Sequence, residues 1–128
     1  MSQKLRTPLS QIQGLGSAKS GTGDFLHQRM TAVALLPLAF WFAIAALAQV
    51  GASHASVMAF LANPINAVLM FLFLSTALYH MTIGLQIIIE DYVHAEGLKL
   101  LCVILVRLGA FAIWAFVTLA LLRLALGH

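Results

Sequence analysis

Three long apolar stretches constrain the fold of this 128-residue chain more than any other feature. They run from about residue 28 to 50, from 65 to 90 and from 99 to 126. Each reaches the roughly 20 residues that a helix needs to cross the hydrocarbon of a bilayer. We therefore predict an all-α membrane protein, a single domain over residues 1–128 with three transmembrane helices and a polar N-terminal segment over residues 1–26.

The composition excludes a small soluble domain. The chain is 62% hydrophobic and only 9% charged, whereas soluble domains carry about a quarter charged residues. A chain of this length buries only about two-thirds of its unfolded surface, so a water-soluble fold could not hide this much apolar area. The net charge of +3 reflects topology, and we predict no nucleic-acid partner.

The segments between the stretches have the residues that end helices. Gly51–Ser56 and the Asn63-Pro64 pair interrupt the pattern, and we expect Pro64 in the first turn of the second helix. Asp91–Gly97 is short enough to make the second and third helices antiparallel neighbours. Pro37 should kink the first helix, which lipid-embedded helices tolerate.

The basic residues predict the orientation. Four of them precede or open the first span, the loop after that span has none, and the second loop has Lys99. The four are Lys4, Arg6, Lys19 and Arg29. The positive-inside rule then places the N-terminus and the second loop in the cytoplasm, with the first loop and the C-terminus outside.

His80 is the polar residue of the second span that most needs a partner. It lies about 16 Å along the helix from Asp91, by helical rise, and polar groups at this depth are costly. One interpretation is a hydrogen bond to Ser, Thr or a backbone carbonyl of a neighbouring helix. The other is axial ligation of a haem iron, with Gly84 one turn away letting a macrocycle or helix approach. A bis-His haem would then need a second His from another chain.

Asp91 and Tyr92 close the second span at the cytoplasmic edge. Eleven residues at about 100° each return Asp91 nearly to the face of His80. Interfacial Tyr is a common membrane anchor, and acidic residues at helix ends are ordinary. The alternative is a proton-linked quinone site, in which the Tyr92 phenol donates to a quinone carbonyl and the Asp91 carboxylate positions it or relays protons.

Polar residues also mark the start of the first span. Asp24 could N-cap the first helix. Arg29 either anchors the span at the interface or pairs with a carboxylate such as a haem propionate. The role of His27, at the same level, is left open. Metal-protease, Walker, dinucleotide-binding and nucleophile-elbow motifs are absent from the sequence, so we expect no complete active site on this chain alone.

Two segments resemble the hydrophobic membrane anchor subunits of succinate dehydrogenase, the D subunits of complex II. One is residues 17–32, which begins Ser-Ala-Lys-Ser-Gly-Thr-Gly-Asp. The other contains Tyr79-His80, Gly84-Leu85-Gln86 and Glu90-Asp91-Tyr92-Val93. The His with Asp-Tyr eleven and twelve residues later is the more specific motif. One departure is Gly23, where some members have His before the Asp.

The resemblance implies half of a heterodimeric helical bundle. A second three-helix anchor subunit of the cytochrome b type would share a haem b, and the pair would dock an iron–sulphur subunit and a flavoprotein on the cytoplasmic side. We expect the membrane to be a bacterial inner membrane rather than a mitochondrial one. Electrons from succinate would reach ubiquinone. His80 resembles the axial haem ligand, Tyr92 with Asp91 the quinone-binding residues, and Arg29 the propionate-side arginine, near His27 and Asp24. A purely structural anchor, or a cytochrome b-type subunit of another membrane dehydrogenase, remains an alternative.

Overall fold

The computed structural model describes residues 18–127 and consists of four helices within that range, without strands. Three of them are long and apolar enough to cross a membrane, which confirms the predicted all-α membrane architecture. The four helices are α2 (Ala18–Ala48), α3 (His54–Ala62), α4 (Pro64–Tyr92) and α5 (Glu96–Leu126). Most of the predicted N-terminal segment, residues 1–17, lies outside the described range.

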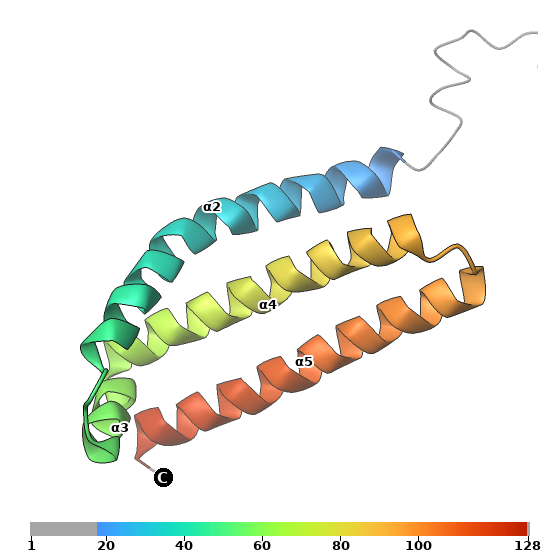
Figure 1. The fold of residues 1–128 in the computed structure, drawn as a ribbon. Helices are drawn as coiled ribbons and strands as arrows, with labels where there is room; N and C mark the ends of the chain where they lie inside the picture. The colour runs from blue at the N-terminus through green and yellow to red at the C-terminus, as the bar shows by residue number, and fades with distance from the viewer. Residues whose placement is uncertain (1–17, 128) are drawn as a thin grey trace, which may run out of the picture.

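The long helices form a single layer with α4 in the middle (Figure 1). α4 packs against both α2 and α5 and runs antiparallel to each. Ring stacking between Phe42 of α2 and Phe73 of α4, with centroids 4.6 Å apart, fixes the register on one side. On the other side, the indole Nε1 of Trp114 donates to the Ser75 hydroxyl at 2.9 Å. Polar residues of α4 can therefore meet either neighbour.

A short helix, α3, occupies the connection for which the sequence predicted only a break. The Ser53 hydroxyl caps its start by accepting from the Ser56 amide. Asn63 ends it and also caps α4, because its side-chain oxygen accepts from the amides of Ile65 and Asn66 at 3.0 and 3.4 Å. Pro64 occupies the first turn of α4, as predicted. Nine residues were too few for a recognisable span, so α3 was missed.

The first helix begins earlier than the sequence suggested. α2 starts at Ala18, so Asp24 lies in its second turn and the predicted N-cap role is wrong. The physical reason is that the polar stretch before the span continues the helix beyond the apolar segment, despite Gly21 and Gly23 within it. Pro37 lies inside the continuous helix, and α2 bends along its length (Figure 1).

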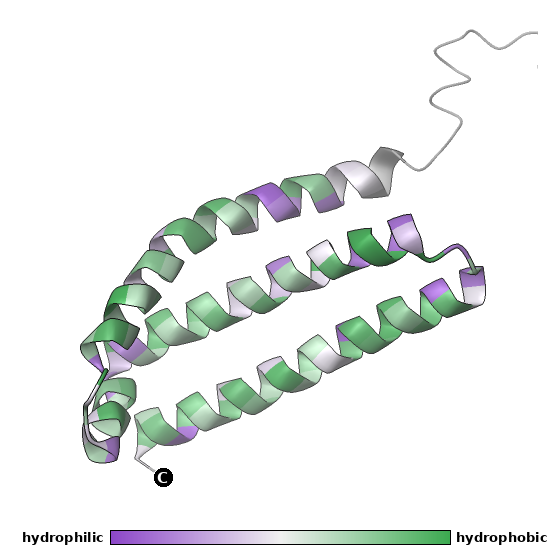
Figure 2. Cartoon of the chain, in the orientation of Figure 1, coloured by the Kyte–Doolittle hydropathy of each residue, from purple (hydrophilic) through white to green (hydrophobic). Residues whose placement is uncertain are grey.

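Almost nothing in this layer is shielded by the chain itself. Among the described residues, only Ala45, Ala67, Ile83 and Leu121 are less than a tenth exposed. Figure 2 shows hydrophobic residues along most of the length of the long helices, and Phe116 is 75% exposed. A surface of this kind is stable only where lipid or another apolar chain covers it.

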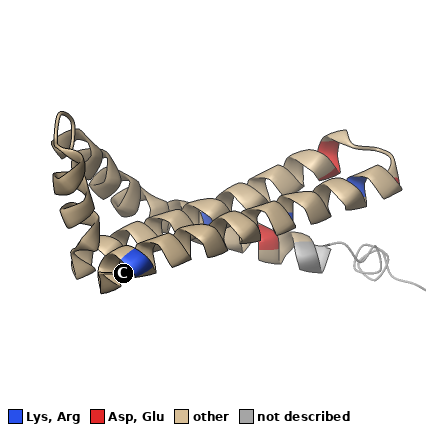
Figure 3. Ribbon diagram, turned by 90° about the horizontal axis from the view of Figure 1, so that it is seen from below, with Lys and Arg blue, Asp and Glu red and all other residues tan. Residues whose placement is uncertain are grey.

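The charged residues gather toward one end of the layer (Figure 3). The antiparallel arrangement brings together the start of α2, the end of α4 and the start of α5. Of the charges from residue 21 onward, only Arg123 lies toward the opposite end. The end of the helix layer at which α4 connects to α5 therefore carries most of the charged residues from residue 21 onward.

Candidate functional site

A polar contact joins α2 and α4 at the level of His80. The Nδ1 atom of His80 lies 2.9 Å from the Thr31 hydroxyl oxygen. The same hydroxyl donates to the backbone of its own helix, with the carbonyls of His27 and Gln28 at 2.8 and 3.1 Å. His80 is partly buried. The interpretation in which His80 bonds a Thr of a neighbouring helix is thus borne out by the geometry.

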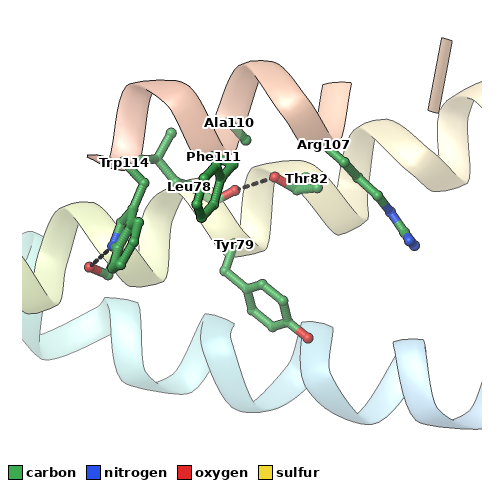
Figure 4. Close-up of a pocket in the computed structure, with 8 residues that line it drawn as sticks. Leu78, Tyr79, Thr82, Arg107, Ala110, Phe111 and Trp114 are labelled. Carbon is green, nitrogen blue, oxygen red and sulfur yellow. Dashed lines mark hydrogen bonds between the residues drawn. The ribbon is translucent and has the colours of Figure 1, made fainter. Parts of the chain in front are cut away.

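A second contact lies beside the first. The Nδ1 atom of His27 lies 2.8 Å from the Tyr79 hydroxyl oxygen, and the two rings are tilted with centroids 5.9 Å apart. Figure 4 shows Tyr79 projecting from α4 toward α2. His27 and Thr31 are one helical turn apart on α2, so the two hydrogen bonds lie next to each other between the same two helices.

Gly84 of α4 faces Gln28 of α2 next to these two contacts. A Cβ built at this position would lie 3.5 Å from the Gln28 side-chain nitrogen, an ordinary van der Waals contact. The Gln28 side-chain oxygen is buried and has no hydrogen-bond partner within the described part of the chain. Buried unpaired acceptors are uncommon in folded proteins, so this carbonyl marks a place where a donor from outside the chain would be stabilised.

The other predicted residues lie away from this cluster or at its edge. Asp91 and Tyr92 are exposed at the end of α4, and Tyr92 is 78% exposed. The Arg29 guanidinium lies over the Phe25 ring, 5.1 Å from its centroid, and two residues of helix turn it away from the face of Thr31. Asp24, seven residues before Thr31, shares that face by helical period. His80, Thr31, His27 and Tyr79 are therefore brought together, and Arg29 is not.

A groove with a cation in its wall lies between α4 and α5 (Figure 4). Its volume is about 290 Å³. The residues that line it are Ser75, Leu78, Tyr79, Thr82, Arg107, Ala110, Phe111 and Trp114. Arg107 donates from Nη2 to the side-chain oxygen Oε1 of Gln86 at 2.6 Å. The side-chain nitrogen Nε2 of Gln86 in turn donates to the Glu90 carboxylate at 2.9 Å. This relay extends from a cation inside the third span to a carboxylate at the polar end.

Across the described residues, no three His, Cys, Asp or Glu side chains gather closely enough to hold a metal ion. His80 has one ring nitrogen at Thr31 and no second hydrogen bond within residues 18–127. Its donor set fits one axial bond to a haem iron through the remaining nitrogen, Nε2.

Sequence reasoning missed the partners of the site residues. Thr31 and Tyr79 lay in the quoted motifs without a role, and the Gln86–Arg107 contact was not predicted. Thr31 follows His27 by four residues, a spacing that puts both on one helix face. That signal identifies a polar face on α2, but only the helix register pairs it with His80.

Comparisons with known proteins identify what this arrangement is similar to. Residues 3–121 match the family described as succinate dehydrogenase/fumarate reductase transmembrane subunit. The succinate dehydrogenase hydrophobic membrane anchor subunit of Rickettsia bellii is 32% identical over 96% of this chain and 99% of its own length. That of Paracoccus denitrificans is 32% identical over 94% and 93%. No solved structure matches significantly.

The Arg107–Gln86 hydrogen bond should stabilise the packing of α4 against α5. We predict that Gln86→Leu lowers the free energy of unfolding by about 1.5 kcal/mol, because the guanidinium loses its acceptor in a low-dielectric environment. Denaturant titration of the purified protein in detergent micelles measures this. Glu90→Gln, which keeps an acceptor for the Gln86 amide, should cost much less. Equal losses in the two variants would mean that the arginine contact contributes nothing.

Proposed function

Because the chain belongs to the family of succinate dehydrogenase/fumarate reductase transmembrane subunits, we propose that it forms half of a haem- and quinone-binding membrane anchor. In this role it docks the iron–sulphur subunit and the flavoprotein of succinate:quinone oxidoreductase. The observation that carries the proposal is His80, held by α2 in the interior of a membrane-spanning helix with one ring nitrogen still available.

The open helix layer supports a second anchor subunit. Three helices in one layer leave large side chains such as Phe116 uncovered by this chain. Lipid can cover part of that surface. A second three-helix subunit, packed against the face that carries His80, would also supply the missing second haem ligand.

The charged end of the layer supports docking of the soluble subunits there. The end of α4 and the start of α5 carry Glu90, Asp91, Glu96 and Lys99, and Figure 3 shows acidic and basic residues at this end. The positive-inside rule assigns it to the cytoplasmic side of a bacterial inner membrane. Soluble subunits that bind here would deliver electrons beside the His80 face.

The residues around His80 fit a shared haem b. Nε2 of His80 would be the ligand to the iron, and the side-chain oxygen of Gln28, which has no partner within the described residues, lies on the same α2 face as Thr31. A haem b in this position supplies a one-electron carrier within the membrane. We assign the haem propionates to the start of α2, where Arg29, His27 and Asp24 lie. Arg29 would contact a propionate from the side of α2 that faces away from α4.

The end of α4 fits the ubiquinone site. Tyr92 presents its phenol at the polar edge, and Asp91 precedes it on the face of His80. The phenol donates a hydrogen bond to a quinone carbonyl oxygen, which stabilises the charge that grows there on reduction. The Asp91 carboxylate then orients the phenol or passes it a proton from the cytoplasm.

Co-purification is the most direct test of the proposed assembly. We predict that the tagged chain, isolated in mild detergent, brings with it a flavoprotein, an iron–sulphur protein and a second three-helix chain in equal amounts. Mass spectrometry identifies the partners. A flavoprotein that oxidises a substrate other than succinate would favour the cytochrome subunit of a different membrane dehydrogenase.

Loss of the His80 imidazole should remove the haem. We predict that the reduced-minus-oxidised spectrum of the purified complex shows a b-type haem, and that His80→Ala abolishes it because alanine has no lone pair to offer the iron. His54→Ala, in the distant α3 helix, should leave the spectrum unchanged. A complex without haem would favour the purely structural anchor.

Loss of the Tyr92 hydroxyl should slow quinone reduction selectively. We predict that Tyr92→Phe lowers succinate:ubiquinone activity about tenfold, equivalent to about 1.4 kcal/mol, while succinate oxidation by an artificial acceptor persists. Thr118→Val is the control, because it also removes a hydroxyl, one that donates to the Trp114 carbonyl within α5, and it should leave quinone reduction nearly unchanged. A parallel fall in both activities of the Tyr92 variant would indicate failed assembly instead.

A further inference from the structure

The Thr31 hydroxyl connects His80 to the backbone of α2. Its oxygen lies 2.9 Å from Nδ1 of His80, 2.8 Å from the His27 carbonyl oxygen and 3.1 Å from the Gln28 carbonyl oxygen. Thr31 and His80 are both partly buried between the two helices. The His80 ring is therefore hydrogen-bonded to α2 through one atom, the Thr31 hydroxyl oxygen, which is itself held by the backbone of that helix.

The proton count at this oxygen determines which His80 nitrogen carries hydrogen. A hydroxyl has one proton to donate, and a carbonyl can only accept. If the proton pointed at His80, two oxygens would face each other at 2.8 Å with no hydrogen between them, which is repulsive. The Thr31 proton therefore goes to a carbonyl of its own helix, and the hydroxyl oxygen accepts from Nδ1–H. The lone pair of His80 is then on Nε2.

Neighbouring polar groups do not offer His80 an equivalent anchor. The His27 ring is engaged with the Tyr79 hydroxyl, and the Thr82 hydroxyl donates to the Leu78 carbonyl at 2.7 Å. Thr31 is the only residue within the described range that forms a hydrogen bond with His80. Its removal leaves a partly buried N–H without an acceptor, which costs free energy in a low-dielectric environment.

We propose that Thr31 is the positioning residue for His80: it selects the Nδ1–H tautomer and holds the ring so that Nε2 is free for an axial bond to haem iron. This inference rests on the proposed haem-ligating role of His80. A hydrogen bond donated by the remote ring N–H also makes the ligating nitrogen a stronger electron donor. Thr31 therefore lowers the reduction potential of the iron, because a stronger donor favours the oxidised form.

The decisive variant is Thr31→Val, which keeps the shape of the side chain and removes the hydroxyl. In the purified complex we expect haem affinity to fall about tenfold or more, the range typical for loss of such an outer partner. The reduction potential of the haem that remains should rise, as measured by redox titration. The low-spin haem signal in electron paramagnetic resonance should broaden, because the ring loses its fixed orientation.

Two controls separate the hydroxyl from general packing. Thr31→Ser keeps the oxygen and should retain the affinity and potential of the unmodified complex. Thr118→Val removes a hydroxyl that donates to the carbonyl four residues earlier in α5, at 2.7 Å, and should change neither. If Thr31→Val does not assemble, Thr31→Ala removes the same hydroxyl without bulk and answers the same question.

The outcomes distinguish this inference from the function on which it rests. An unchanged haem affinity and potential in Thr31→Val, or a Ser variant that behaves like the Val variant, overturns the positioning role and leaves the anchor function standing. A complex without haem, or a haem unaffected by His80→Ala, overturns the ligand role of His80 and this inference with it. A lower haem affinity and a higher reduction potential in Thr31→Val, both restored in Thr31→Ser, support the inference.

Discussion

The structure depends on one constraint: in lipid, apolar burial gives helices little reason to associate, because acyl chains are as apolar as leucine. The layer of α2, α4 and α5 buries almost no side chain completely. Its helices are instead joined by directional contacts, the hydrogen bonds of Thr31 with His80 and of Trp114 with Ser75. Such contacts are stronger where water cannot compete. Polar residues in these helices therefore have a structural role before any chemical one.

The three spans could be predicted because membrane thickness imposes a length and a composition that short sequence windows reveal. The start of α2 and the α3 helix could not, since neither is set by the bilayer. α2 extends to Ala18 through polar residues outside the apolar stretch, and α3 depends on local caps at Ser53 and Asn63. Local hydrogen bonding, which hydropathy does not report, determines both boundaries.

The site was predictable in part for the same reason. His80 stood out because an imidazole at that depth has to be satisfied. Its partner Thr31 did not, since a threonine in a membrane helix can bond its own backbone and needs no other helix. Arg29 shows a related limit: the sequence places it at the level of His27, but only the structure shows that its guanidinium lies over the Phe25 ring. Register between helices and rotation about each axis are the information that a single sequence lacks.

The central place of α4 explains why the polar residues of this chain concentrate on it. A helix with a neighbour on each side can direct Tyr79 and His80 to α2 while it directs Ser75 and Gln86 to α5. Together these contacts restrict the rotation of α4 about its axis from both sides. The direction of the His80 ring and the exit angle of α4 at Asp91 and Tyr92 are thereby coupled. His80 and Tyr92 belong to the same helix, so contacts that restrict the rotation of α4 set the direction of the imidazole and of the phenol twelve residues later together.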